Sequence, residues 1–554
     1  MKKFVFLMLL TFSVLAQSAD EVDLSMVHRI KQEAFQNGKV MDHMFYLTDV
    51  NGPRLSGSPG YKSAADWAVG RLKEWGLENA RLESWGKFGR SWSLKKFDAH
   101  VVQPFYAPVS GFPHAWSDST DGRIKAEVVY SPLFFPWEDD LRRDPSRIRE
   151  RVKSYEQRNK GKFRGKIVMT DPWREHEQPQ YAPSDRLDED ELSSVTEPFE
   201  PYAFPPFQWP VTRLPEDPKA RERFLNSLPL EIDADLWEQQ QNAWDTLITF
   251  LNEEGAVGNF KASARGIGGT LYAIEAGSHR AGHPVPVASV ALEREQYGRI
   301  ARLIEKKIPV FVEMEMQVDF PSEEVDGWNV IAELPGWRKK DEIVMLGAHL
   351  DSWHGGTGAT DNAAGSAVVL EAIRILKTLN LKMDRTIRMA LWDGEEQCLC
   401  GSRAYVKQHF ADPVLMKLKP DHSKISGYFN LDNGTGKIRG VYLQGNDMMR
   451  PVFEEWFEPF ADLKATTITI QDTTGTDHLS FDAVGIPGFQ FIQDPLEYDN
   501  RTHHSNIDVY DHISPADLMQ ASAIMASFVY NAATREEMLS RKPLPKPLPP
   551  KQSN

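Results

Sequence analysis

Two cysteines in 554 residues, Cys398 and Cys400, are too few to build a disulfide scaffold. One residue separates them, so a disulfide between them would close a very small ring that ordinary disulfide geometry disfavours. We therefore expect two buried free thiols, with a disulfide and a metal role as the alternatives.

The sequence also lacks long apolar runs and an excess of basic residues. A bilayer crossing takes about 20 apolar residues, and no stretch after the first 20 positions reaches that length, so we expect no membrane span in the mature chain. The chain has 64 Lys and Arg against 79 Asp and Glu, a formal net charge of -15. An acidic surface does not attract nucleic acid or anionic membranes, so neither is an expected partner.

The N-terminus has the pattern of an export signal. Two lysines precede an apolar run from Phe4 to Ala16, which small and polar residues then follow. This order predicts a signal peptide over residues 1–19 and a periplasmic or secreted protein.

The stretch VMLGAHLDSWHGGTGATDNAAG, residues 344–365, carries the densest chemistry. Its apolar start predicts a buried strand that ends in a polar loop with His349, Asp351 and Asp361. Apolar residues at spacings of three and four then predict a helix with Asp361 at its N-cap. The carboxyl end of a parallel strand usually presents a binding site in this way.

Three later predicted strands also end in acidic or imidazole side chains. Glu395 and Glu396 follow the first, Asp432 follows the second, and a loop with His504 follows the third. We therefore expect an α/β fold with a mixed, largely parallel central sheet flanked by helices, and these side chains together at one edge of it.

Carboxylates and imidazoles crowded into one crevice would repel and desolvate one another unless cations neutralised them. Nitrogen and oxygen ligands without cysteine suit zinc, with manganese or cobalt as alternatives. Five ligands are expected: His349, Asp361, one of the two glutamates, Asp432 and His504. They are too many for one tetrahedral ion, but they fit two ions that share a bridging carboxylate. The sequence therefore predicts a two-metal site.

The adjacent pair Glu395 and Glu396 is expected to divide its roles. Neighbouring side chains on an extended segment point in different directions, so both are not expected on one ion. One would be a ligand and the other a base toward water. Asp351, two residues after His349, is placed to accept a hydrogen bond from that imidazole and fix its orientation.

Six motifs in this order, HLDSW, GATDNAAG, WDGEEQ, NLDNGTG, GTDHLSF and HHSNID, resemble the co-catalytic zinc exopeptidase family of aminopeptidases, and within it the carboxypeptidase Q type. The resemblance implies that Asp361 bridges two zinc ions, with His349 and Glu396 on one ion and Asp432 and His504 on the other. It implies Glu395 as the general base.

Four further residues near these motifs are interpreted as supporting or structural. His503 and His354 are expected to be loop residues and not ligands. Asp477 and His478 are expected to be a helix N-cap and a surface histidine, although the family places their loop near the substrate.

The resemblance also implies a domain division. Residues 20–118 and 322–540 would form the peptidase domain, and residues 119–321 an inserted β-rich domain similar to protease-associated domains. The Pro-rich and acidic stretch 175–218 is expected to be a long irregular loop, whose aromatic residues either line a cleft or pin the loop to the surface. Residues 541–554 are expected to be a disordered tail. The start of the chain, including the RLSGSPG loop, is expected to lack chemistry.

The resulting functional hypothesis is an exported metallo-exopeptidase that hydrolyses dipeptides or short peptides. No arginine cluster can be assigned to a substrate carboxylate, so amino-, carboxy- and dipeptidase activity stay open, as does a homodimer. The alternatives are a glutaminyl-cyclase-like acyltransferase with one zinc ion and a non-catalytic peptide-binding protein on the same fold.

Overall fold

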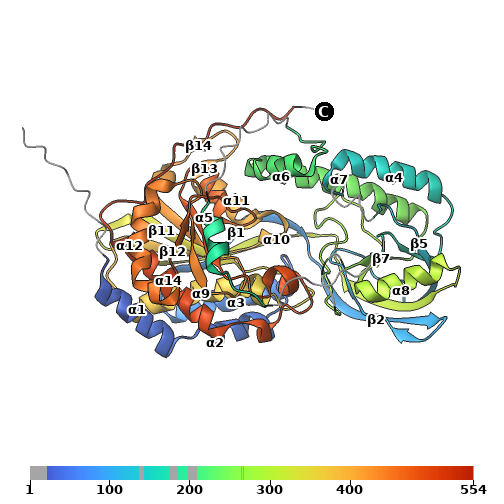
Figure 1. Cartoon of the computed structure of the whole chain (residues 1–554), viewed down its shortest axis with the longest axis horizontal. Coiled ribbons are helices and arrows are strands. Elements are labelled where there is room, and N and C mark those ends of the chain that lie inside the picture. The colour runs from blue at the N-terminus through green and yellow to red at the C-terminus, as the bar shows by residue number, and fades with distance from the viewer. Residues whose placement is uncertain are drawn as a thin grey trace, which may run out of the picture.

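The computed structural model of the protein describes residues 22–135, 142–174, 184–197, 209–263, 265 and 268–552. The predicted signal peptide and most of the aromatic run 198–210 lie outside these residues. Two sheets, each with its own helices, form the two domains visible in Figure 1, which we call the catalytic domain and the second domain.

The catalytic domain has an eight-stranded mixed sheet. Its four neighbouring central strands are parallel, which confirms the predicted fold class. In spatial order the strands are β1 (Glu78–Arg90), β10 (Glu324–Leu334), β12 (Arg385–Trp392), β11 (Lys339–His349), β15 (Ile425–Asn430), β18 (Gly488–Gln493), β16 (Ile438–Tyr442) and β17 (Thr467–Thr469).

Helices cover both faces of this sheet because its central strands are apolar on both sides. In β11, Val344 and Leu346 face one layer of helices while Ile343 and Met345 face the other. The first layer comprises α1 (Leu24–Asn37), α2 (Val40–Phe45), α3 (Pro59–Glu74), α9 (Ala364–Thr378), α12 (Arg450–Phe457) and α14 (Pro515–Thr534). The second comprises α11 (Cys400–His409) and α13 (His478–Asp482).

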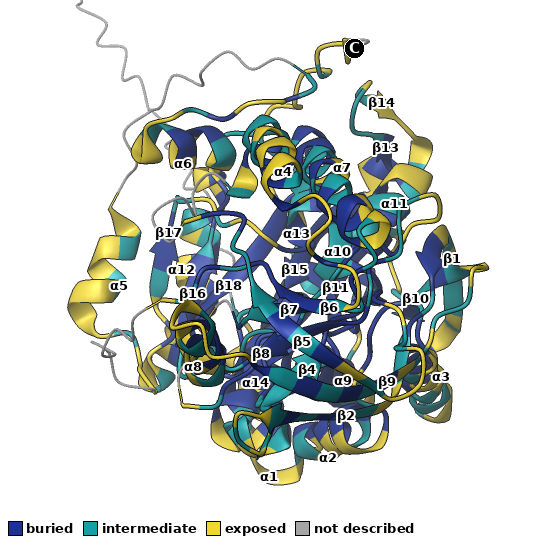
Figure 2. Ribbon diagram, turned by 90° about the vertical axis from the view of Figure 1, so that its right-hand side faces the viewer, coloured by how far each residue is buried: buried dark blue, intermediate teal, exposed yellow. Residues whose placement is uncertain are grey.

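The last helix, α14, lies in the middle of the first layer. It begins after Ser514 with Pro515 in its first turn, and the serine side chain makes no capping bond. Phe528 packs against Phe429, Phe453 and Phe491 from three other elements. Burial of a side chain of this size stabilises the fold by about 1.5–3 kcal/mol. Figure 2 shows the resulting buried interior, with exposed residues on the outer faces of the helices.

In the part of the chain that the structure describes, no helix is both long enough and apolar enough for a bilayer crossing.

The second domain has its own eight-stranded sheet. Helices α4 (Pro145–Asn159) and α7 (Leu230–Glu253) pack on one face, and α8 (Arg294–Glu305) packs on the other. In spatial order the strands are β3 (Ala107–Pro108), β2 (Ser93–Gln103), β9 (Phe311–Asp319), β5 (Ile124–Tyr130), β6 (Lys166–Met169), β7 (Gly258–Ala262), β8 (Ser289–Leu292) and β4 (Gly111–Pro113).

The second domain begins earlier than predicted. Residues 93–113 were assigned to the peptidase domain, but β2 pairs with β9 and β4 pairs with β8. The chain therefore crosses between the sheets near residues 91–92, not at residue 119. The error arose because alternation along a strand does not reveal which sheet the strand joins. The similarity of this domain to protease-associated domains stays a prediction.

The described parts of the stretch 175–218, residues 184–197 and 209–218, contain more regular structure than predicted. Within its described residues, α5 (Glu189–Thr196) forms a helix whose N-terminus is closed by a capping box between Asp188 and Glu191. Arg186 forms ion pairs with Asp494 and Asp517 of the catalytic domain. Charge pairing and a local cap therefore supply the order that a Pro-rich composition did not predict.

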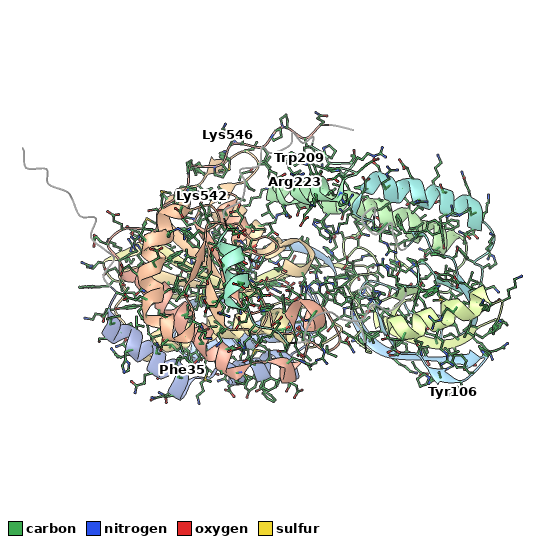
Figure 3. All side chains as sticks on the ribbon, in the orientation of Figure 1. Phe35, Tyr106, Trp209, Arg223, Lys542 and Lys546 are labelled. Carbon is green, nitrogen blue, oxygen red and sulfur yellow. A yellow bond between two sulfur atoms is a disulfide. The ribbon has the colours of Figure 1, made fainter. Side chains whose placement is uncertain are left out.

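Residues 541–552, the described part of the predicted disordered tail, are held against the protein, which corrects another prediction. The backbone N–H of Leu548 donates to the carbonyl of Val414 in the catalytic domain, and that of Gln552 donates to the carbonyl of Trp209 beside α6 (Pro218–Asn226). Lys551 pairs with Asp235 of α7. Figure 3 shows Lys542 and Lys546 of this segment along the same edge as Trp209 and Arg223. These hydrogen bonds and the packing of Leu548 hold the segment in place.

The two cysteines also differ from expectation. Cys398 and Cys400 form a disulfide and are only half-buried, so the expectation of buried free thiols is wrong. Their intervening residue Leu399 has a positive φ of 49°, a local conformation that the sequence alone did not reveal.

Candidate active site

The predicted site residues meet at the carboxyl ends of the four parallel strands. His349 is the last residue of β11, and Asp432 lies two positions beyond β15. Asp361 lies between β11 and α9, and His504 lies in the loop after β18. Gly394, at a positive φ of 71°, turns the chain from β12 into α10 (Glu395–Cys398), which begins with the glutamate pair. A side chain there would strain this left-handed conformation.

Asp361 joins two groups of ligand-type side chains, one at each of its oxygens. Its Oδ1 lies 3.2 Å from His349 Nε2, which is itself 3.2 Å from Asp432 Oδ1. Its Oδ2 lies 3.0 Å from His504 Nε2, which is 2.9 Å from Glu396 Oε2. The geometry therefore has the form of two adjacent sites with one shared carboxylate.

These distances correct the predicted pairing of the ligands. The resemblance implied His349 with Glu396 and Asp432 with His504, whereas the structure groups His349 with Asp432 and His504 with Glu396. Both β12 and β15 lie beside β11, but the turn at Gly394 into α10 carries Glu396 toward His504, while Asp432 reaches His349. The order of residues along the chain does not contain that information.

Glu395 lies apart from the second group. Its Oε2 is 3.9 Å from His349 Nε2, at the rim of the first group. Burial raises the pKa of Glu395, while the nearby His349 opposes the shift and Asp432 adds to it. A carboxylate that is near the centre but less engaged with the histidines is the one available to accept a proton.

Asp351 supports both His349 and the glutamate pair. Its Oδ1 lies 3.5 Å from His349 Nδ1, and its backbone carbonyl lies closer to the same nitrogen, at 3.1 Å. The backbone N–H groups of Glu395 and Glu396 also donate to its two oxygens at 3.3 Å. Asp351 is fully buried. It therefore fixes the position of a candidate ligand and of the candidate base together.

The RLSGSPG loop contributes to the site, so its expected lack of chemistry is wrong. Ser56 donates a hydrogen bond to Asp351 and accepts one from the backbone of Gly394. The buried guanidinium of Arg54 donates to four backbone carbonyls around the site, those of Leu47, Leu350, Thr357 and Gly358. Burial lowers the pKa of Arg54 to about 10, against the opposing charges of Asp508 and Asp351.

The sequence did not reveal the role of Arg54, because a single arginine in a Gly-rich loop is usually exposed to solvent. The one signal in the sequence was the loose resemblance of RLSGSPGY to the family, which did not distinguish Arg54 from its neighbours.

Asp361 is not the N-cap of α9, contrary to prediction. It has extended backbone angles three residues before the helix starts, and Asn362 instead accepts a hydrogen bond from the backbone of Gly365. Asp508 holds this turn, because its carboxylate accepts from the backbone N–H groups of Thr360 and Asp361. The carboxylate of Asp361 is thereby left for the site.

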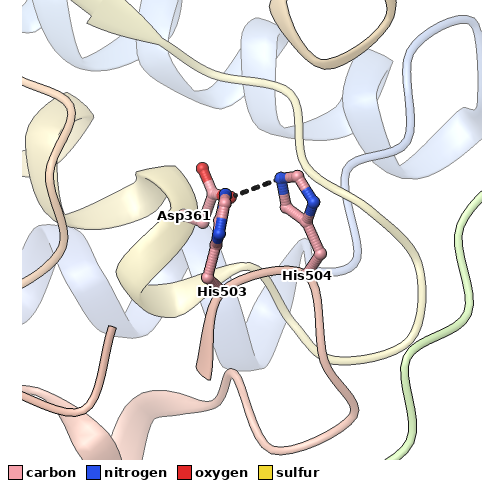
Figure 4. Close-up of side chains that lie close together, drawn as sticks. All are labelled: Asp361, His503 and His504. Atoms are coloured by element: carbon pink, nitrogen blue, oxygen red, sulfur yellow. Dashed lines mark ion pairs between the residues drawn. The ribbon is translucent and has the colours of Figure 1, made fainter. Parts of the chain in front are cut away.

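The four supporting residues have mixed outcomes. His354 donates to or accepts from no candidate ligand in the described chain and contacts the carbonyl of Pro113 instead. His503 lies closer than expected, with its Nε2 3.5 Å from Asp361 Oδ2, and Figure 4 shows both imidazoles beside that carboxylate. Asp477 precedes α13 without a capping bond, and His478 is buried, so the surface interpretation of His478 is wrong.

The donor set fits divalent zinc. It contains imidazole nitrogens and carboxylate oxygens, and Glu396 Oε1 is buried without a hydrogen-bond partner among the described residues. Burial opposes protonation of His504, yet the Glu396 and Asp361 carboxylates raise its pKa to about 10. Burial and Asp361 also raise the pKa of Glu396 to about 7. A positive charge is therefore needed to offset the repulsion between the buried carboxylates, and a metal ion would supply it.

Several known proteins are similar to the part of the chain that carries the candidate site. Residues 329–529, which carry every candidate ligand, match the model described as peptidase family M28. Carboxypeptidase Q of Rattus norvegicus is 30% identical over 258 residues, which cover 46% of this chain and 52% of that protein. Leupeptin-inactivating enzyme 1 of Streptomyces exfoliatus is 34% identical over 170 residues, 30% of this chain and 36% of that protein.

The chain spans about half the length of the carboxypeptidase Q relatives that it matches. Solved structures extend the fold similarity to both domains. A peptidase M28 precursor from Shewanella amazonensis SB2B has a TM-score of 0.63 at 23% identity, covering 95% of this chain and 99% of its own. A zinc aminopeptidase from Bacillus subtilis has a TM-score of 0.52 at 18% identity, covering 90% and 95%.

Proposed function

We propose that this protein is an exported zinc metallo-exopeptidase that hydrolyses dipeptides or short peptides at a site for two zinc ions. The observation that carries the proposal is the position of Asp361, whose two oxygens lie 3.2 Å from His349 and 3.0 Å from His504. A carboxylate shared by two ligand groups is the arrangement that two-metal hydrolytic sites use.

The proposed ligands divide as the geometry groups them. His349 and Asp432 would hold one ion, His504 and Glu396 the other, and Asp361 both. Zinc bound there supplies a Lewis acid that activates water and polarises a carbonyl at neutral pH. The raised pKa of Glu395 suits a residue that accepts a proton from water near the rim of the site.

Glu395 would then return that proton to the leaving amine. Asp351 would keep the His349 imidazole and the start of α10 in place throughout, because it binds both. The relatives support the choice of reaction: the names carboxypeptidase Q and zinc aminopeptidase both describe removal of terminal residues.

The test is a panel of dipeptides and end-blocked peptides, assayed with a chelator and after zinc is restored. The proposal expects chelator-sensitive hydrolysis of peptides with a free terminus and two zinc ions per chain. One ion per chain together with pyroglutamate formation would favour a cyclase instead. No hydrolysis across the panel with zinc present would favour a non-catalytic binding protein.

A further inference from the structure

The second domain reaches the candidate active site through Arg265 and residues 268–272. Leu271 and Asn506 exchange two hydrogen bonds, one between each backbone N–H and an oxygen of the other residue. Tyr272 forms a bridge with Ser505, next to His504. Side chains of this segment are therefore fixed against the loop that carries the histidines.

Arg265 and Tyr272 of this segment lie together at the site. The guanidinium of Arg265 lies 4.6 Å from the ring centre of Tyr272, in a cation-π contact. Its Nη1 is 3.3 Å from His503 Nδ1. The other nitrogen of that imidazole is 3.5 Å from Asp361 Oδ2. A single imidazole ring therefore separates the guanidinium from the central carboxylate.

Both side chains keep donors available. Among the described residues Arg265 forms no ion pair with a carboxylate, although only the His503 ring separates it from Asp361. Tyr272 is 93% buried, since 7% of its surface is exposed, and its hydroxyl has no hydrogen-bond partner among the described residues. Its ring centre lies 6.0 Å from that of His504. A buried hydroxyl without a partner beside an active site is a place where a ligand would bond.

We propose that Arg265 and Tyr272 bind the free C-terminal carboxylate of the substrate. A guanidinium is the side chain best matched to a carboxylate, and it would repel the N-terminal ammonium. Because a residue spans roughly 3.3–3.6 Å, a carboxylate one or two residues beyond a carbonyl at Asp361 reaches this position. The inference rests on the proposed peptidase function and narrows it to dipeptides and tripeptides with free C-termini.

Hydrolysis of Leu-Gly and of Leu-Gly amide tests the assignment, because the two substrates differ only in the terminal charge. The measured quantity is the ratio of kcat/KM for the acid over the amide. Loss of a charge-assisted hydrogen bond is expected to lower this ratio about 10- to 100-fold in Arg265→Gln, and less in Tyr272→Phe. Arg280→Gln, which removes a half-exposed arginine of the same domain paired with Glu238, should leave the ratio at the wild-type value.

An unchanged ratio in Arg265→Gln would overturn the assignment, as would an equal loss on both substrates. Calorimetric titration of the zinc-loaded Glu395→Gln variant with the same two peptides separates this result from a failure of the proposed function. Tighter binding of the acid than of the amide, lost on adding Arg265→Gln, supports the assignment even without turnover. Equal binding of acid and amide would contradict it.

Discussion

The carboxylate of Asp351 lies 3.5 Å from Nδ1 of His349 and accepts a hydrogen bond from the backbone N–H of Glu395, so one buried group holds two parts of the site. Asp351→Asn would keep the shape but weaken both contacts. We expect zinc affinity or kcat/KM to fall about 10- to 100-fold, the usual cost of losing an orienting partner. Zinc titration and kinetics at saturating zinc measure the two quantities separately. Wild-type values for both would show that Asp351 is only structural.

Glu395→Gln is expected to retain zinc and lose turnover, because the amide keeps the size of the side chain but accepts no proton. General-base catalysis typically contributes about 10²- to 10⁴-fold to the rate, so kcat should fall at least about 100-fold. Metal analysis of the purified variant provides the control, with two zinc ions per chain expected. A variant as active as the wild-type protein would remove Glu395 from the role of base.

Arg54→Met should destabilise the protein by about 3–5 kcal/mol, the usual cost of breaking a buried charge network. Four backbone carbonyls would lose their donor, and the charge that faces Asp508 and Asp351 would disappear. Arg71→Met, on the half-exposed surface of α3, is the matched control and should change stability by less than about 0.5 kcal/mol. Denaturant unfolding followed by fluorescence measures both. A loss no larger than that of the control would contradict the role given to Arg54.

Glu371 on α9 should make stability depend on acid pH. Burial opposes ionisation, but hydrogen bonds from His43 and Arg374 lower the pKa of Glu371 to about 2 from an ordinary 4.5. Since the native state binds this proton more weakly than the unfolded state, the stabilisation is full above pH 4.5. It is lost as the pH falls toward 2, in total on the order of 3 kcal/mol.

The measurement is the unfolding free energy between pH 2 and pH 6, in chelator so that metal binding does not contribute. Glu371→Gln should flatten the curve in this window, whereas Glu455→Gln, on an exposed position of α12, should leave the slope unchanged. An equally steep curve for Glu371→Gln would show that other carboxylates dominate acid unfolding.

The sequence predicted the central sheet and the meeting of His349, Asp361 and His504. Apolar runs that end in polar residues can be recognised directly in the amino-acid sequence. It did not predict which ligand pairs with which, since the strands before Glu396 and Asp432 both lie beside β11 and the turns that follow them decide the pairing. Arg54 and Arg265 were missed for a related reason. Each acts across more than 200 positions, and composition and periodicity describe only local structure.

The C-terminal segment has a mechanical consequence. The chain passes from the catalytic domain into the second domain near residues 91–92 and returns between β9 and β10. Two neighbouring connections without other contacts would form a hinge. Backbone hydrogen bonds from Leu548 to Val414 and from Gln552 to Trp209 add a third connection between the domains. The C-terminus lies at the top of Figure 1. Shortening the chain by a dozen residues would remove these bonds and leave the ion pairs of Arg186 and the Leu271–Asn506 hydrogen bonds to hold the two domains together.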